Sequence, residues 1–240
     1  MLSPVAVVGV IPAAGFATRL APLSCSKEVY PVGGRPVLEY LVDRMRLGPA
    51  SEIRIVTRPE KRDVLELARR LGLTAIEGRP ATVAESVLLG LGGVADEDTV
   101  LLGFPDTLWE PDDGFATLAA ALDERTEIVL GCFGSSEPER SDVVVSAGDG
   151  TVHAVQVKPE RPASDLVWGC CAARAAALAG LRRHDEPGAL FDELARAGAV
   201  RFVRFPGELV DIGTPASLRR AEAVTRAWHV PGTGSERATA

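Results

Sequence analysis

The chain of 240 residues is long enough for one large or two small domains, and its 46% hydrophobic content is sufficient to build a core. A net charge of −7 argues against general binding of nucleic acid or of a membrane surface, because such proteins need a basic face. No apolar run reaches the ~18 to 20 residues of a membrane span, and the N-terminus lacks the pattern of a signal peptide. We therefore expect a cytoplasmic protein.

Strand and helix patterns alternate through the first 133 residues. Continuous apolar, β-branched runs, typical of strands buried on both faces of a parallel sheet, alternate with amphipathic helical patterns. This alternation predicts βαβ units and a three-layer α/β/α, Rossmann-like fold with a mostly parallel sheet. The expected strands are 5–11, 52–56, 74–77, 99–104 and 127–133, and the expected helices are 36–48, 62–72, 82–93 and 115–125.

The spacing changes after residue 133. Shorter strands joined by turns predict a small β-rich insertion, and Thr214 with Pro215 is a typical N-cap and first position of a helix. We expect a single domain over 1–228, since no linker composition interrupts it, and a disordered tail at 229–240. The expected strands are 142–148, 150–158, 165–173, 201–205 and 208–212, and the expected helices are 173–183, 188–198 and 215–228.

The chain holds four cysteines without CxxC spacing, which we interpret as reduced and structural: Cys25, Cys132, Cys170 and Cys171. If Cys170 and Cys171 lie on a strand, their side chains point to opposite faces of the sheet. The histidines, His153, His184 and His229, are predicted to be structural or surface residues.

Lysine is rare in this chain, since only Lys27, Lys61 and Lys158 stand among 26 basic residues. An ammonium group is a compact point charge with three donors, so it enters a tight oxygen cluster that a planar guanidinium does not fit. Lys27 and Lys158 are therefore candidate ligand-binding residues. Lys61, in RPEKRD at the start of a predicted helix, is interpreted as a solvated surface charge.

The loop after the first strand has the features of an anion site. The small residues Ala13, Ala14 and Gly15 allow a ligand to approach the backbone at the carboxyl edge of the sheet, where open α/β sheets bind ligands. Arg19 and Lys27 could then approach a polyphosphate from two sides. The segment contains neither GxGxxG nor the P-loop pattern GxxxxGK[ST], so a nicotinamide-dependent enzyme is not favoured.

The segment PAAGFATRLAPLSCSKEVYPVGGRPVLEY resembles the signature of the sugar-1-phosphate nucleotidyltransferases, most closely the glucose-1-phosphate uridylyltransferase and thymidylyltransferase branches. Two departures are visible, Ala17 in place of a glycine and Ser26 in place of a proline. The resemblance implies a nucleotidyltransferase fold with a nucleotide-binding part at about 1–133 and a sugar-phosphate-binding part at about 134–228. It implies that the nucleotide-binding residues are Ala13, Ala14, Gly15, Arg19, Lys27 and Thr82. Of these, Arg19 and Lys27 would be catalytic.

Two aspartates match the metal-binding positions of that family. Asp106 ends the apolar run in LLGFPDTLW, and Asp211 lies in ELVDIGTPASL, where Leu209 replaces the family's tryptophan. Two carboxylates suit Mg²⁺, which binds a few carboxylates together with phosphate oxygens and water. The resemblance therefore implies Mg²⁺ on Asp106 and Asp211.

The segment VQVKPERPASDLVWGC resembles the family's sugar-phosphate segment and places Lys158, Asp165 and Gly169 at that site. Val157 replaces a glutamate that binds sugar hydroxyls, and valine accepts no hydrogen bond. Either another residue binds the hydroxyls, or the acceptor is not ordinary glucose 1-phosphate. Thr82, in EGRPATVAESVLLG, stands at a glycine of the base-recognition segment, so the nucleobase stays open, with UTP or dTTP favoured.

The resemblance implies transfer of a nucleoside monophosphate from a nucleoside triphosphate to a sugar 1-phosphate, or a cyclitol 1-phosphate, with release of pyrophosphate. The attacking phosphate is already ionised near neutral pH, so no general base is needed. The alternative is a non-catalytic, nucleotide-sensing regulatory subunit of the same fold. The family also implies a homo-oligomer.

Overall fold

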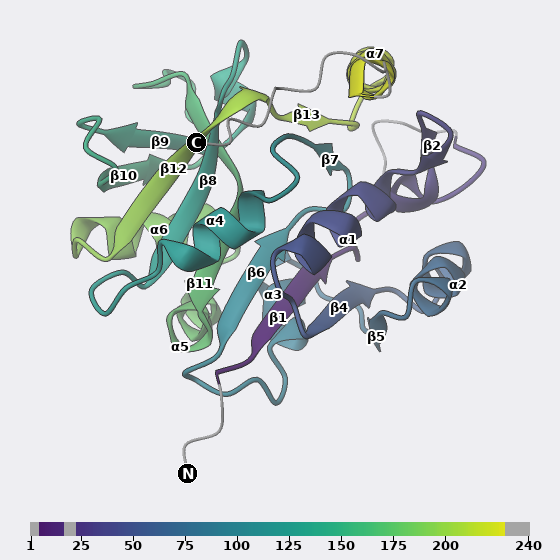
Figure 1. Cartoon of the computed structure of the whole chain (residues 1–240), viewed down its shortest axis with the longest axis horizontal. Coiled ribbons are helices and arrows are strands. Elements are labelled where there is room, and N and C mark those ends of the chain that lie inside the picture. The colour runs from purple at the N-terminus through teal and green to yellow at the C-terminus, as the bar shows by residue number, and fades with distance from the viewer. Residues whose placement is uncertain (1–4, 17–22, 229–240) are drawn as a thin grey trace, which may run out of the picture.

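The computed structural model describes residues 5–16 and 23–228 (Figure 1). Arg19 and the predicted tail at 229–240 lie outside the described residues. The strands are β1 Val7–Pro12, β2 Pro31–Val32, β3 Arg35–Pro36, β4 Glu52–Thr57, β5 Thr74–Glu77, β6 Thr99–Gly103, β7 Thr107–Leu108, β8 Ile128–Gly134, β9 Val143–Ser146, β10 Val152–Gln156, β11 Leu166–Arg174, β12 Val200–Glu208 and β13 Val210–Asp211. The α-helices are α1 Val37–Leu47, α2 Arg62–Arg70, α3 Val83–Gly90, α4 Gly114–Ala120, α5 Ala175–Leu178, α6 Pro187–Arg196 and α7 Pro215–Trp228, and the short 3-10 helices are η2 Lys27–Val29, η3 Pro138–Arg140 and η4 Ala179–Arg183.

A mixed sheet forms the centre of the molecule. Within the described part of the chain it has nine strands, with β10, β9, β11, β6, β1, β4 and β5 in that order. Strand β8 also pairs with β11, and β12 pairs with β8. Strands β1, β4, β5 and β6 are parallel, whereas β11 runs antiparallel to both β6 and β8. The prediction of a mostly parallel sheet is confirmed, and the buried apolar runs of β1 and β6 occupy its centre.

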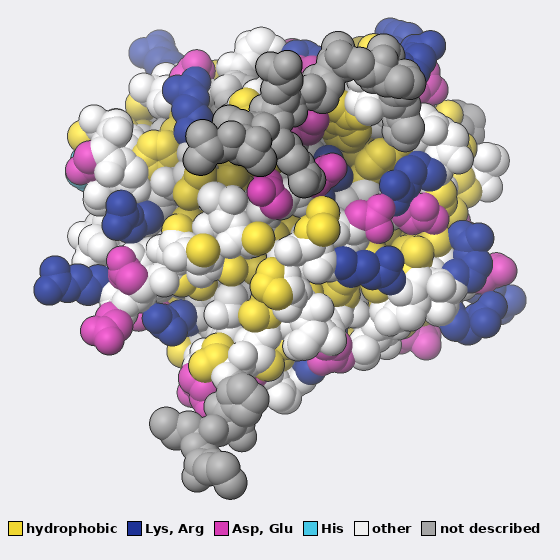
Figure 2. All heavy atoms as spheres, viewed as in Figure 1, with side chains coloured by type: hydrophobic (Ala, Val, Ile, Leu, Met, Phe, Trp, Pro, Cys, Tyr) yellow, Lys and Arg dark blue, Asp and Glu magenta, His cyan; other side chains and the backbone are white. Residues whose placement is uncertain are grey.

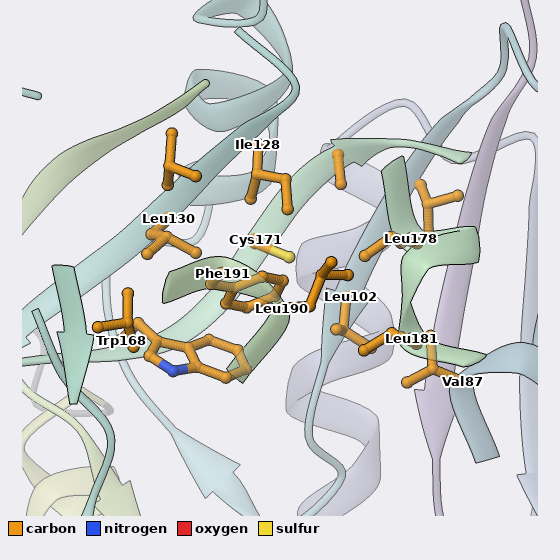
Figure 3. Close-up of a cluster of buried hydrophobic side chains, with 14 of the residues drawn as sticks. Val87, Leu102, Ile128, Leu130, Trp168, Cys171, Leu178, Leu181, Leu190 and Phe191 are labelled. Atoms are coloured by element: carbon orange, nitrogen blue, oxygen red, sulfur yellow. The ribbon is translucent and has the colours of Figure 1, made fainter. Parts of the chain in front are cut away.

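Helices cover both faces of the sheet, which gives three layers (Figure 1). Helices α1, α2 and α4 pack on one face through residues such as Leu41, Leu67 and Phe115. Helices α3 and α6, with η4, pack on the other face, where Figure 3 shows Val87, Leu181 and Phe191 meeting strand residues. This arrangement confirms the predicted α/β/α class.

Alternation along β11 separates the two cysteines as predicted. Cys170 lies in the core under α1, α2 and α4, and Cys171 lies in the core on the opposite face. Both are free thiols. Burial raises the pKa of the Cys171 thiol to about 12 and raises the pKa of Cys170 as well, so both side chains are inert packing groups.

The predicted helix at 173–183 begins later than expected. Ala173 and Arg174 belong to β11, because Ala173 pairs with Ile128 and Arg174 with Thr99. Pairing across the sheet therefore overrides the helical preference of an alanine-rich segment. The remainder divides into α5 and η4.

Two pairs of short strands and helix α7 form a separate small layer outside the main sheet. The pairs β2–β3 and β7–β13 lie beside α7, and their apolar side chains share a third core that includes Val32, Leu108 and Ala221. Thr214 caps α7 as predicted, since its Oγ1 accepts a hydrogen bond from Ser217 N at 3.1 Å. In the described ranges, no helix combines the length and apolar character needed to cross a bilayer.

The aromatic cluster beneath α4 provides a test of the core. Phe133 is 0% exposed and packs between Trp109 and Phe205, with ring centroids at 5.8 and 5.6 Å. We expect Phe133→Ala to lower the free energy of unfolding by about 3 to 5 kcal/mol, because it removes the ring and leaves a cavity. Leu47→Ala, at an exposed position, should change it by less than about 0.5 kcal/mol. Urea denaturation measures both, and equal effects would contradict the assignment of this core.

Candidate functional site

The loops that follow the parallel strands meet at one edge of the sheet. Ala13 N donates to Val56 O at 2.8 Å, which ties the loop after β1 to β4. Arg58, directly after β4, donates from Nε to Ala14 O at 2.7 Å and from Nη2 to Pro80 O at 3.0 Å. One arginine therefore connects the loops after β1, β4 and β5. This is the edge at which open α/β sheets bind ligands.

The loop after β1 leaves room at its tip. Ala13 and Ala14 are buried, whereas a side chain on Gly15 would meet no described protein atom within 4 Å. Phe16 is exposed and lies 4.5 Å from the Arg58 guanidinium. The small residues predicted for ligand approach therefore lie at the expected place.

Lys27 and Asp106 form an ion pair at this edge. The Lys27 ammonium, at the start of η2, bonds Asp106 Oδ2, and the two side chains are 22% and 12% exposed. Burial alone would lower the pKa of Lys27, but the carboxylates of Asp106, Glu28 and Asp211 outweigh it and raise that pKa. The structure therefore brings Lys27 together with both predicted metal-binding aspartates.

Asp106 and Asp211 hang from neighbouring backbone segments. Asp211 in β13 pairs with Thr107 of β7, and Ile212 N donates to Asp106 O at 3.0 Å. Within residues 5–16 and 23–228, no group of three or more His, Cys, Asp or Glu side chains is arranged to hold a metal ion. Two carboxylates on neighbouring segments are a donor set that suits Mg²⁺, whose other ligands in proteins are phosphate oxygens and water. These residues therefore fit the implied ion.

The interpretation of Lys61 as a solvated surface charge is wrong. Its side chain is 10% exposed, and Nζ donates to Ala13 O at 2.8 Å, Gly15 O at 3.0 Å and Glu28 Oε1 at 2.6 Å. The lysine lies just before α2, and α2 begins against η2 rather than in solvent. The rarity of lysine was a signal for a specific role of Lys61 too. The local sequence does not show that the start of this helix packs against another segment.

Glu28, the partner of Lys61, is fully buried. It is 0% exposed, and among the described residues its Oε2 has no hydrogen-bond partner. Burial raises the pKa of the Glu28 carboxyl, and the Lys61 and Lys27 ammonium groups oppose that effect. A buried carboxylate held by one lysine and adjacent to another is a feature that the sequence did not predict.

Ser26 departs from the family's proline for a visible reason. Its N–H and Oγ–H both donate to the Asp63 carboxylate, at 2.6 and 2.7 Å. Burial alone would raise the pKa of Asp63, but these hydrogen bonds outweigh it and hold the pKa below its ordinary value. Proline has no N–H to donate. Lys27 thus lies between two residues, Ser26 and Glu28, that are each anchored to the start of α2.

Lys158, just after β10, lies near two carboxylates. It has φ 41°, is 54% exposed, and donates from Nζ to Glu186 Oε1 at 2.9 Å. Nearby Asp142 accepts from Trp168 Nε1 at 3.3 Å, and its buried Oδ1 has no hydrogen-bond partner among the described residues. Burial raises the pKa of Asp142, and Lys158 opposes this effect. The sequence predicted Lys158 but neither acidic neighbour.

The other residues predicted for the sugar phosphate lie in different surroundings. Asp165 lines a surface hollow of about 430 Å³ with Ser146 and Arg204, a lining that does not include Lys158. Gly169 lies in β11, where a Cβ atom would approach Leu209 Cδ1 to 2.6 Å. The glycine therefore accommodates the leucine that replaces the family's tryptophan.

Thr82 caps α3. Its Oγ1 accepts from Glu85 N at 3.1 Å, and Glu85 Oε2 accepts from Ala81 N, the residue before the cap, at 2.6 Å. This explains a threonine at a family glycine. His184 lies near Thr82 in a small hollow and bonds Glu193 from Nε2 at 2.9 Å, His153 is exposed, and His229 lies outside the described residues.

Charges of both signs are distributed over the face shown in Figure 2, where basic and acidic side chains lie interspersed. On a chain of net charge −7, an anionic ligand would need local cations rather than a basic surface.

Comparisons with known proteins show which family this chain resembles. The sequence model of the MobA-like NTP transferase domain matches residues 9–186. The chain is 27% identical to a glucose-1-phosphate thymidylyltransferase of Neisseria meningitidis over 168 residues, and 25% identical to the bifunctional protein GlmU of Bradyrhizobium diazoefficiens over 242 residues. These matches cover 65% and 91% of this chain, but 57% and 52% of the relatives, so the chain spans little more than half of their length.

A solved structure shares the fold. It is a Bacillus anthracis protein provisionally named glucose-1-phosphate thymidylyltransferase, in complex with a sucrose. It superposes with a TM-score of 0.80 at 20% identity and covers 92% of this chain and 96% of its own. The likeness confirms the fold class.

The raised pKa of Lys27 predicts how its ion pair depends on pH. A lysine whose folded pKa lies above its unfolded value, about 10.4, stabilises the fold fully below that value and loses this contribution as the pH rises through the folded pKa. The difference in unfolding free energy between wild type and Lys27→Met should therefore shrink above about pH 10.4. Urea denaturation at a series of alkaline pH values measures it, with Arg70→Met as the control. A difference that stays constant would contradict the pairing.

Proposed function

Because the chain belongs to the MobA-like NTP transferase domain family, we propose that it transfers a nucleoside monophosphate from a nucleoside triphosphate to a sugar 1-phosphate and releases pyrophosphate. The observation that carries the proposal is the Lys27–Asp106 ion pair, with Asp211 beside it, at the carboxyl edge of the parallel strands. The relatives named glucose-1-phosphate thymidylyltransferase support this reaction class.

On the donor side, Lys27 is the residue that we assign to the triphosphate. Its ammonium is paired with Asp106 at the sheet edge that also carries the loop of Ala13–Gly15, and its raised pKa keeps it charged at neutral pH. Arg19, in the same loop sequence, is assigned the same task. Both cations would stabilise the charge that develops on the departing pyrophosphate. Mg²⁺ held by Asp106 and Asp211 would offset the repulsion between the two anionic substrates.

On the acceptor side, Lys158 would orient the attacking phosphate. A phosphomonoester is largely ionised near neutral pH, so its oxygen attacks without a general base. Val157 offers no hydrogen-bond acceptor on its side chain, but the carboxylate of Glu186 binds Lys158 and that of Asp142 lies near it. We assign to them the recognition of hydroxyl groups on a sugar or cyclitol ring. The nucleoside triphosphate that we propose is UTP or dTTP.

A substrate screen tests the reaction. We expect pyrophosphate release from UTP or dTTP with Mg²⁺ and one of a panel of sugar and cyclitol 1-phosphates. Lys27→Met should lower kcat/KM about 10²- to 10³-fold, the range for losing one charge-stabilising donor, while Arg70→Met at an exposed end of α2 keeps wild-type activity. If no pair of substrates turns over, a non-catalytic nucleotide sensor becomes the better description.

Removal of the acceptor-side cation should affect one substrate selectively. We expect Lys158→Gln to raise the KM for the acceptor phosphate by about tenfold or more and to leave the KM for the triphosphate within about twofold, because only the acceptor would contact this lysine. Steady-state kinetics with each substrate varied separately measures the split. Arg140→Gln, an exposed cation on η3, is the control, and an equal rise in both KM values would argue against the assignment.

A further inference from the structure

Lys61 fills its hydrogen-bonding capacity with three oxygens. Its ammonium has three donors, and it meets two backbone carbonyls, of Ala13 and Gly15, and one carboxylate oxygen, of Glu28, at 2.6 to 3.0 Å. A compact ammonium suits such a cluster, whereas the planar fork of an arginine does not. The geometry therefore specifies a lysine at this position.

These oxygens come from two segments that flank the proposed triphosphate site. Ala13 and Gly15 belong to the loop after β1, and Glu28 directly follows Lys27 on η2. Asp63, two residues after Lys61, binds Ser26 on the other side of Lys27. The start of α2 thus fixes the loop and the lysine relative to each other.

The direction of the two carbonyls has a consequence for anion binding. Peptide units are planar and trans, so a carbonyl that points to Lys61 directs the N–H of the following residue to the opposite side. The N–H groups of Ala14 and Phe16 are therefore oriented away from Lys61. Two backbone N–H groups that point to the same side of a loop can both donate to one anion.

Stability alone is a poor explanation for this ion pair. Glu28 is 0% exposed and its Oε2 has no hydrogen-bond partner among the described residues. Desolvation of two charges offsets much of their attraction, and well-packed apolar residues are often as stable. An ammonium bound by two carbonyls and a carboxylate fixes the positions of these groups, whereas two apolar residues in place of Lys61 and Glu28 would not.

We propose that Lys61, with Glu28, is a positioning residue that sets the loop of Ala13–Gly15 against Lys27 so that both hold one polyphosphate. This inference rests on the proposed function for its ligand. Misplacement of a binding group by about 1 Å can cost about 100-fold in rate, so loss of the three bonds should weaken donor binding without contact between Lys61 and the substrate.

The decisive variant is Lys61→Met, with Arg62→Met as the matched control, because Arg62 is the exposed neighbour at the start of the same helix. In the ligand-free protein, Lys61→Met should speed amide exchange in a peptide covering Ala13–Phe16 by about tenfold. It should also raise the Kd for magnesium tripolyphosphate and the KM for the triphosphate by about tenfold, with the acceptor KM within about twofold. Arg62→Met should change none of these.

Unchanged amide exchange at Ala13–Phe16 in Lys61→Met would overturn the proposal. A lower free energy of unfolding with an unchanged Kd for magnesium tripolyphosphate, measured where the variant is folded, would also overturn it. If Lys61→Met does not fold, Glu28→Gln is measured instead. A glutamine keeps a carbonyl for Lys61, so smaller changes in the same direction are expected, and wild-type values would count against the proposal. Absence of turnover in the wild type would sink the proposed function, whereas the exchange comparison would still decide the role of Lys61.

Discussion

The pairing of each lysine with a carboxylate is the constraint on which the site depends. Lys27 binds Asp106, Lys61 binds Glu28 and Lys158 binds Glu186. A chain of net charge −7 that is to hold polyanions must concentrate positive charge at a few points without destabilising the ligand-free fold. Carboxylate partners satisfy that requirement. In the proposed reaction, an anionic substrate would compete with these carboxylates for the ammonium groups of Lys27 and Lys158.

The three ion pairs differ in how exposed their lysine side chains are, and this difference suits them to different roles. The lysine side chains are 10% exposed at Lys61, 22% at Lys27 and 54% at Lys158. A buried pair costs desolvation and holds a fixed geometry, whereas an exposed pair is screened by water and contributes little. The two deeper pairs, at the proposed triphosphate site, are therefore held in a fixed arrangement tied to the start of α2. The acceptor side, with a mostly exposed lysine, can exchange partners at low cost.

Periodicity and motif spacing predicted what depends on local sequence. The apolar runs of β1 and β6, the cap at Thr214 and the opposite faces of Cys170 and Cys171 all follow from residue type and period, and the structure confirms them. Lys61 was misjudged because its surroundings depend on how α2 lies against η2, which no local pattern contains. Asp142 and Glu186 were missed for the same reason, since they reach Lys158 from separate segments.

The departures from the family signature are not equivalent once their surroundings are considered. Ser26 replaces a proline and binds Asp63, Thr82 replaces a glycine and caps α3, and Leu209 replaces a tryptophan and lies over Gly169. Each of these changes is matched by a contact within the chain, so it needs no change of ligand. Val157 differs, because its side chain is 38% exposed beside Lys158 and replaces a hydrogen-bonding residue by an apolar one. We therefore expect this chain to depart from its relatives in the acceptor that it recognises rather than in how it holds the triphosphate.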